Sequence, residues 1–289
     1  MSQSKLLVIF QFTGNTSFNV AISSGCVLLV NFSLKAGVIV SFDISGCSIQ
    51  SKQRSSCRFC TNSTSWSPCC SKGAMGFCVF GNIVIAARYA QRMHGLKRVF
   101  IIDFDVHHGN GTNDAFYEDP DIFFLSTHQA GSYPGTGKID QIGSGNGERS
   151  TLNLPLPGGS GDTAMRTVFD EVIVPCAQRF KPDIILVSAG YDAHLLDPLA
   201  SLQITTGTYY MLASSIKQLA RDLCGGHCVF FLEGGYNLSC LSNSVAESFR
   251  ALLGDRSLAS ELDDPSYLHE EPLKKVKQII EKVKQIHSF

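Results

Sequence analysis

Two carboxylates and two imidazoles follow directly after one apolar run of the sequence. The run Arg98–Ile102 leads into Asp103, Asp105, His107 and His108, and glycines then turn the chain. Alternate side chains of a strand share a face, so we expect Asp103, Asp105 and His107 to point to the same side. Core packing gives no reason to desolvate carboxylates beside histidines, which favours a metal site over a polar loop. The pattern predicts metal chemistry at the carboxyl end of a buried strand, where open α/β sheets place their active sites.

The elements that would position this site alternate regularly after about Gly73. Runs rich in Ile, Val and Phe predict strands at Val99–Asp103, Ile122–Ser126, Asp183–Ser188 and Cys228–Leu232. Amphipathic periodicity predicts helices at Ile83–His94, Ala164–Phe180, Thr208–Leu223, Ser242–Leu253 and Pro272–His287. Apolar strands that alternate with helices are typical of a parallel sheet covered on both faces. We therefore predict an α/β fold with three α-β-α layers and a mostly parallel central sheet.

Composition limits the class of protein. The chain has 289 residues, 44% of them hydrophobic, which suits one large α/β domain or two small ones. A net charge of −1 gives no overall attraction to nucleic acid or to an anionic membrane, so we expect neither as a partner. Residues 18–42 are apolar, but Ser23, Asn31 and Lys35 interrupt them too often for a transmembrane helix. The 11 cysteines form no regular framework, which favours a reducing, intracellular compartment.

The amino-terminal part of the chain has a different texture. Residues 44–72 are crowded with Ser, Cys, Gln and Arg and show neither helical nor strand periodicity. The pair Cys57-x-x-Cys60 suggests a zinc ribbon, but the adjacent cysteines further on lack the spacing that one tetrahedral ion requires. We therefore expect residues 1–72 to be an atypical segment and residues 73–289 to form the main domain with a carboxy-terminal helix.

Further motifs stand at the ends of other predicted strands and beside the first helix. They read Gly76-Phe77-Cys78, Ser126-Thr127-His128, Tyr133-Pro134-Gly135-Thr136-Gly137, Ser188-Ala189-Gly190-Tyr191-Asp192-Ala193-His194 with Asp197-Pro198, and Glu233-Gly234-Gly235-Tyr236-Asn237. In this order and spacing the chain resembles the zinc-dependent histone deacetylases, which have the arginase/deacetylase fold. Asn110 and the Glu-Gly-Gly-Tyr form resemble class II, and residues 72–270 resemble the organelle-associated plant members of that class.

The resemblance implies a catalytic zinc site. Asp105, His107 and Asp197 match the family's zinc ligands, and three protein ligands leave a position open for water and the substrate carbonyl. Tyr236 matches the phenol that donates a hydrogen bond to the developing oxyanion. We interpret Asp192 as a structural residue, because a carboxylate before a proline, as at Asp197, fits the ligand position better.

The same resemblance assigns roles around the zinc ligands. Asp103 and Ser126 correspond to a buried monovalent-cation site, usually potassium. Asp103 and Asn110 would also orient the two histidines that form the family's general base. The tunnel for the acyl-lysine side chain would have two aromatic walls and small or aliphatic residues at its lining and rim. These tunnel positions are Gly76, Phe77, Tyr133 and Ile204.

The family's general base, a histidine pair, has no counterpart in this chain. Counting back from Phe77 places the pair at Ser67 and Pro68, and neither side chain can accept a proton from a zinc-bound water. Codons allowed for Phe59–Lys72, read one nucleotide later, can spell Phe-Ala-Leu-Ile-Arg-Pro-Pro-Gly-His-His-Ala-Val-Pro-Lys, which contains such a pair. We hypothesise that residues upstream of about Lys72 are translated out of frame or from a wrongly assigned exon. The chain as written is then expected to bind metal, to hydrolyse amides poorly, and to have a fold that is incomplete at the amino end.

The leading expectation is a zinc-dependent amide hydrolase that removes acetyl groups from lysine side chains of histones or other proteins. A small-molecule deacetylase acting on acetylated polyamines has the same tunnel chemistry and stays open. A non-catalytic scaffold that keeps the fold also stays open, and Ser67 and Pro68 favour it. A binuclear manganese ureohydrolase is disfavoured, because Gly109 stands where a further carboxylate is needed. The compartment stays open between cytoplasm or nucleus and, with a transit peptide, plastid or mitochondrion, and no oligomeric state follows from the sequence.

Overall fold

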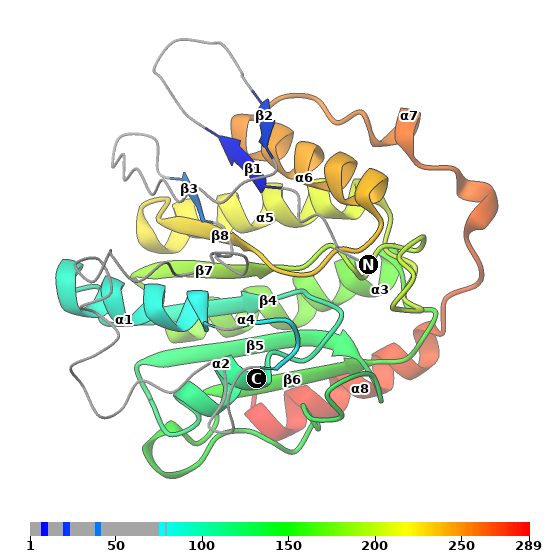
Figure 1. The fold of residues 1–289 in the computed structure, drawn as a ribbon. Helices are drawn as coiled ribbons and strands as arrows, with labels where there is room; N and C mark the ends of the chain where they lie inside the picture. Colours follow the sequence, from blue (N-terminus) through cyan, green and yellow to red (C-terminus); the bar gives the residue numbers. More distant parts are fainter. Residues whose placement is uncertain (1–6, 11–19, 24–37, 42–74, 79) are drawn as a thin grey trace.

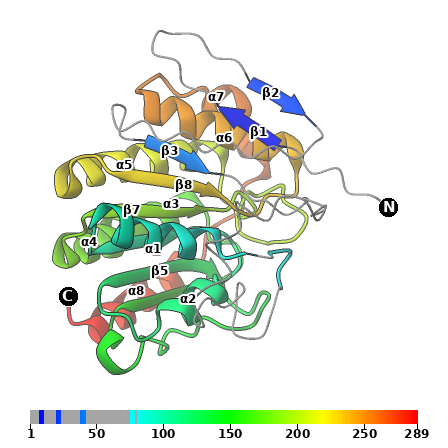
Figure 2. The ribbon, with the colours of Figure 1, turned by 60° about the vertical axis from the view of Figure 1, so that its left-hand side comes forward.

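A parallel sheet runs through the centre of the structure, a computed structural model that describes residues 7–10, 20–23, 38–41, 75–78 and 80–289. The sheet has six strands in the order β3-β8-β7-β4-β5-β6, and every neighbouring pair is parallel (Figures 1 and 2). A separate antiparallel pair is formed by β1 (Leu7–Phe10) and β2 (Val20–Ser23). The strands of the sheet are β3 (Val38–Ser41), β4 (Val99–Asp103), β5 (Ile122–Gln129), β6 (Thr151–Leu156), β7 (Ile184–Ala189) and β8 (Cys228–Leu232).

The helices cover both faces of this sheet. Helices α1 and α2 lie on one face, and α3, α4, α5 and α8 lie on the other, with α6 packed against α5 (Figures 1 and 2). A π-helical turn, Phe169–Ile173, joins α3 to α4. This arrangement confirms the predicted α/β fold with three layers. The helices are α1 (Asn82–His94), α2 (Asn110–Phe116), α3 (Asp162–Val168), α4 (Val174–Phe180), α5 (Thr206–Cys224), α6 (Leu238–Leu253), α7 (Ala259–Leu262) and α8 (Leu273–His287).

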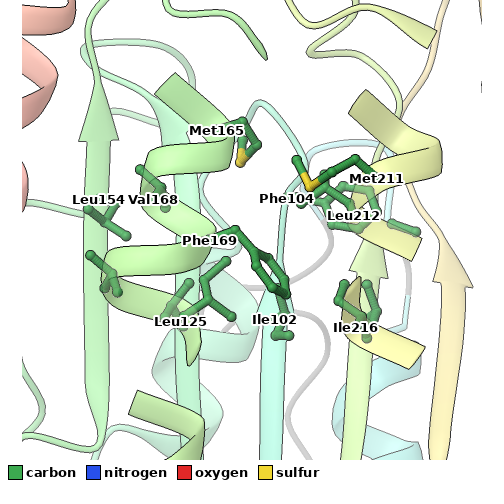
Figure 3. Close-up of a cluster of buried hydrophobic side chains, with 14 of the residues drawn as sticks. Ile102, Phe104, Leu125, Leu154, Met165, Val168, Phe169, Met211, Leu212 and Ile216 are labelled. Carbon is green, nitrogen blue, oxygen red and sulfur yellow. The ribbon is translucent and has the colours of Figure 1, made fainter. Parts of the chain in front are cut away.

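The side chains of the central strand β4 alternate between two hydrophobic clusters. Phe100 and Ile102 belong to the larger cluster, on the side of α3, α5 and α8, and Figure 3 shows Ile102 facing Phe169 of the π-helical turn. Val99 and Ile101 belong to the smaller cluster, beneath α1 and α2. All four β4 side chains are fully buried. A strand buried on both faces reads as a continuous apolar run, which is why β4 could be predicted from the sequence.

Strand β6 and helix α2 do not stand out in the sequence. Asn153 and Pro155 interrupt the apolar run of β6, and its proline is tolerated because β6 is an edge strand. Helix α2 is short, and a glycine lies within its first turn. The four predicted strands are present as β4, β5, β7 and β8. The segment expected to be atypical, residues 1–72, contains β1–β3, but Ser67, Pro68 and the paired cysteines lie outside the described residues.

Two carboxylates near the carboxyl end of the chain cap helices that begin far earlier in the sequence. Glu271 accepts three backbone hydrogen bonds at the start of α3, from Gly161, Thr163 and Ala164, at 2.8–2.9 Å. Asp263 accepts two backbone hydrogen bonds at the first residues of α5, at 2.9–3.0 Å. Each carboxylate satisfies N–H groups that have no partner inside the helix, and its charge is favourable at the positive end of the helix dipole.

We expect Glu271→Ala to destabilise the protein by about 1–2 kcal/mol, because the first N–H groups of α3 lose their acceptor and a favourable charge. The measurement is urea unfolding followed by circular dichroism. Glu270→Ala is the matched control, since Glu270 is an exposed neighbour. Equal midpoints for the two variants would show that the cap contributes nothing.

His287, at the end of α8, should make the fold sensitive to acid. Burial, and then the charges of Arg179 and Arg149, lower the pKa of His287 to about 4. The unfolded chain takes up this proton near pH 6.5, whereas the folded chain takes it up only near pH 4. Stability therefore falls as the pH drops through this window, by about 3 kcal/mol for this residue. We expect His287→Leu to flatten the decline in the unfolding free energy between pH 6.5 and 4, and an unchanged slope would contradict this assignment.

Membrane insertion and disulfide bonding find no support in the part of the chain that the structure describes. No helix there combines the length and the apolarity needed to cross a bilayer. Cys176, Cys224, Cys228 and Cys240 are free thiols, and burial raises the pKa of Cys176 and Cys228 to about 12. These thiols therefore stay protonated at neutral pH.

Candidate metal centre and active site

The candidate site lies where the carboxyl ends of β4, β7 and β8 meet. Because the strands are parallel, the segments that leave them start at the same edge of the sheet. Strand β4 continues into Asp105 and His107, β7 into Asp192, and β8 into the loop that carries Tyr236. Residues far apart in the sequence are thus brought to one place.

Three side chains converge with the geometry of a metal site. Ligand atoms of Asp105, His107 and Asp192 all lie within 4.8 Å of one another. The Nδ1 atom of His107 is 3.2 Å from Oδ1 of Asp105 and 3.1 Å from Oδ2 of Asp192. Burial works to lower the pKa of His107, but the hydrogen bonds to the two carboxylates raise it to about 10. The two carboxylates therefore favour a positive charge beside Nδ1 of His107.

The backbone around the two carboxylates is closely packed. The Oδ2 atom of Asp105 accepts a hydrogen bond from Gly234 N at 2.9 Å, and Oδ1 of Asp192 accepts one from Val106 N at 2.9 Å. A Cβ atom at Gly190 or Gly234 would collide with the carboxylate oxygens, so both positions need glycine. Burial, and then the charge of Asp105, raise the pKa of Asp192 to about 7. The other two oxygens, Oδ1 of Asp105 and Oδ2 of Asp192, both face Nδ1 of His107, and we call this group of three side chains the cradle.

Asp197 does not belong to this convergent set, although the sequence led us to expect Asp197 as a ligand and Asp192 as a structural residue. Its Oδ2 atom accepts hydrogen bonds from the backbone N–H groups of Tyr236 and Asn237, and Oδ1 accepts one from Leu199 N. Both oxygens are therefore directed at backbone. Asp192 lies three residues after the end of β7, and Asp105 lies two residues after the end of β4.

Three aromatic rings surround the mouth of the cradle. Phe77 and Tyr236 make an edge contact with ring centroids 6.2 Å apart, and the Tyr133 ring lies 6.3 Å from that of His107. Phe77 is 71% exposed and Tyr133 52% exposed, which is unusual for large apolar side chains that serve only the core. Burial, and then the charges of Asp192 and Asp105, raise the pKa of the Tyr236 phenol well above its usual value. Tyr236 is therefore a proton donor at neutral pH.

The structure does not place Ile204 at an open rim. Its side chain is 1% exposed and packs in the larger hydrophobic cluster. Leu199, in the same loop, is 49% exposed, and its backbone N–H donates to the Asp197 carboxylate, which also accepts from the backbone N of Tyr236. Gly76 lies beside the Tyr133 ring, because a Cβ atom at Gly76 would lie 3.5 Å from it.

The residues expected at a second cation site lie behind the cradle. Asp103 and Ser126 are paired in register on β4 and β5 and are buried. Burial, and then the charges of Asp105 and Glu233, hold the pKa of Asp103 well above its usual range. The Ser126 hydroxyl shares a 3.0 Å hydrogen bond with the His128 ring, and Asn110 donates to a methionine sulfur. Only the Asp105–His107–Asp192 group qualifies as a metal cluster among the described residues.

Two further histidines lie beneath the site as neutral rings. The rings of His108 and His128 are 4.9 Å apart, and His108 Nδ1 lies 2.8 Å from the hydroxyl of Thr136. Burial lowers the pKa of His108 to about 4 and that of His128 to about 3. Both rings are uncharged at neutral pH and support the loop that carries Tyr133.

Comparison with known proteins decides the family. Residues 14–252 match the model of the histone deacetylase domain. The chain belongs to the histone deacetylase family. This confirms the resemblance inferred from the motifs, and the matched range begins well before the expected boundary at Gly73. The family assignment also accounts for a cation cradle at the end of a parallel sheet.

Two plant histone deacetylases are similar over the same part of the chain. Histone deacetylase 14, chloroplastic, of Arabidopsis thaliana is 77% identical over 216 residues, which are 75% of this chain and 51% of that protein. Histone deacetylase 10, chloroplastic, of Oryza sativa subsp. japonica is 75% identical over 218 residues, which are 75% of this chain and 49% of that protein. The chain thus spans about half the length of these relatives.

Two solved histone deacetylase structures share the fold. The HD domain of HDA15 is 37% identical, with a TM-score of 0.64, and the match covers 74% of this chain and 56% of that one. The histone deacetylase Clr3 is 34% identical, with a TM-score of 0.64, and the match covers 72% and 35%. At these levels of identity the likeness extends beyond topology to the sequence.

Proposed function

We propose that this histone deacetylase chain binds zinc through Asp105, His107 and Asp192 and hydrolyses the amide of acetylated lysine side chains in proteins. The observation that carries the proposal is the convergence of these three ligand atoms, two carboxylate oxygens and one imidazole nitrogen. Zinc prefers such nitrogen and oxygen ligands, and three of them leave a position for water and substrate. Bound zinc would polarise the amide carbonyl and acidify a water molecule.

Other side chains of the chain would stabilise the reacting oxygen, bind the lysine side chain and hold a second cation. The Tyr236 hydroxyl, kept protonated by its raised pKa, donates a hydrogen bond to the oxygen that gains negative charge. The exposed rings of Phe77 and Tyr133 flank the aliphatic part of the lysine side chain and exclude water from it. Burial, and then the charges of Asp105 and Glu233, raise the pKa of Asp103, and a monovalent cation, potassium in our proposal, beside Asp103 and Ser126 would offset this carboxylate charge.

The general base of the family has no counterpart in the sequence of this chain. Ser67 and Pro68 stand at the positions that the family resemblance assigns to the histidine pair. Among the described residues, His108 and His128 are buried and bonded elsewhere, so they do not take over this role. We therefore propose that the chain binds metal and substrate but hydrolyses amides slowly. The names of the two plant relatives favour a plastid compartment over the alternatives.

The test combines metal analysis with turnover of an acetyl-lysine peptide by the full chain. We expect one zinc ion per chain and slow, zinc-dependent release of acetate that Tyr236→Phe reduces further by about 100-fold. A protein that binds no zinc would contradict the site. Zinc binding without any detectable turnover, or with turnover of acetylated polyamines only, would replace the proposed reaction by a scaffold or a small-molecule activity.

A further inference from the structure

The loop that carries Tyr236 is anchored up to Gly234, which donates to Asp105 Oδ2 at 2.9 Å and accepts from Tyr191 N at 2.8 Å. Residues 233–237 connect β8 to α6 and include Gly234 and Gly235. Gly235 has a φ of 139°, a conformation that only glycine adopts readily. Backbone preferences therefore do not fix the direction of the residue that follows, and external contacts must do so.

Asp197 supplies these contacts from the loop after β7. Its Oδ2 atom lies 2.7 Å from the backbone N of Tyr236 and 3.3 Å from that of Asn237. Its Oδ1 atom lies 3.0 Å from the backbone N of Leu199. The Asp197 side chain is buried, and hydrogen bonds from N–H groups to a desolvated carboxylate are stronger than neutral ones.

Asn237 reinforces the same connection in the opposite direction. Its Nδ2 group donates to the carbonyl oxygen of Leu196 at 3.0 Å, and its Oδ1 atom caps α6 by accepting from Cys240 N at 3.2 Å. The two loops are therefore joined by hydrogen bonds in both directions. Tyr236 directly precedes Asn237, so these hydrogen bonds hold the backbone on the carboxyl side of Tyr236.

We propose that Asp197 is a positioning residue that holds Tyr236 in the orientation required for its hydrogen bond to the reacting carbonyl. This rests on the proposed function, in which Tyr236 acts during amide hydrolysis. The Asp197 carboxylate binds the backbone N of Tyr236 itself, so a shift of this contact moves the base of the phenol side chain. Displacements of about 1 Å at such a group cost on the order of 100-fold in rate.

The first test is the kinetic effect of Asp197→Ala in the full, zinc-loaded chain. We expect kcat for an acetyl-lysine peptide to fall by about 10- to 100-fold with little change in KM, because the lost contact acts in the transition state. Bound zinc should stay at the level of the unmodified chain. Glu271→Ala is the matched control, since it also removes a carboxylate that accepts three backbone N–H groups, and its kcat should not change.

A double-mutant cycle separates positioning from general loss of structure. If Asp197 acts through Tyr236, Asp197→Ala should have no further effect on kcat in a Tyr236→Phe background. The same fold-loss in both backgrounds would overturn the proposal. Loss of zinc in Asp197→Ala would also overturn it, because Asp197 would then be a metal ligand.

Hydrogen exchange tests the contact without any turnover. We expect the amides of Tyr236 and Asn237 to exchange at least about tenfold faster in Asp197→Ala than in Glu271→Ala, because they lose their buried acceptor. Equal exchange in the two variants would refute the proposal even if the enzyme is active. An unmodified chain without turnover but with this exchange difference would refute the proposed hydrolysis and leave the role of Asp197 in holding the Tyr236 segment established.

Discussion

Asp192→Ala is expected to lower zinc affinity by about 100-fold or more and to abolish zinc-dependent turnover. The substitution leaves only Asp105 and His107 in the cradle, and two protein ligands do not hold zinc at the affinity of three. Zinc should also cease to raise the thermal midpoint, because stabilisation by a ligand depends on its affinity for the folded state. Competition with a chromophoric chelator and elemental analysis measure both affinity and stoichiometry.

Asp197→Ala is the control for this experiment, because Asp192 and Asp197 both lie in the loop after β7 and are both buried. It should retain zinc at the level of the unmodified chain. The reverse outcome, with zinc retained in Asp192→Ala and lost in Asp197→Ala, would restore Asp197 as the ligand. Such a result would also require Asp197 to give up the hydrogen bonds that it accepts from three backbone N–H groups.

Restoring a histidine pair at positions 67 and 68 should raise the rate of amide hydrolysis more than any other change. We expect replacement of Phe59–Lys72 by the segment read in the shifted frame, which includes Ser67→His and Pro68→His, to raise kcat by about 10²–10⁴-fold. The physical reason is that general acid–base catalysis needs an imidazole near the attacking water, and neither serine nor proline has a pKa in the useful range. Initial rates on an acetyl-lysine peptide at matched zinc content are the measurement.

The control for this replacement is the same segment with alanine at positions 67 and 68. It restores the surrounding residues without the base, so it should gain little activity. A large gain with alanine there would mean that the segment acts on folding. No gain with the histidines, in a folded and zinc-loaded protein, would show that the out-of-frame hypothesis does not explain the missing pair.

The residues of the site could be predicted where they directly follow a continuous apolar strand. The β4 side chains are buried on both faces, so the strand was clear in the sequence, and the alternation after it placed Asp105 and His107 on one side. The third side chain of the convergent group could not be chosen in this way. Asp192 and Asp197 lie on one irregular loop, where no periodicity shows which carboxylate turns inward and which binds backbone.

Exposure of loop side chains was equally hard to predict. Ile204 and Leu199 are both aliphatic residues after Asp197, yet the first packs in the core and the second is half exposed. The difference arises from the bridge that pairs Ile204 with His194, a contact made only after the chain has folded. Tertiary contacts of this kind decide burial in loops, and the local sequence does not carry them.

The first turns of α3 and α5 are completed by carboxylates that are synthesised later than the helices themselves. Both helices pack on the central sheet, but the carboxylates that complete their first turns, Glu271 and Asp263, follow the helices in the sequence and are therefore synthesised after them. Until they emerge from the ribosome, the N–H groups at both helix starts must be satisfied by water. The nascent domain therefore passes through a stage in which the starts of these two helices lack their caps, because Glu271 is made 110 residues after Gly161 and Asp263 is made 57 residues after Thr206.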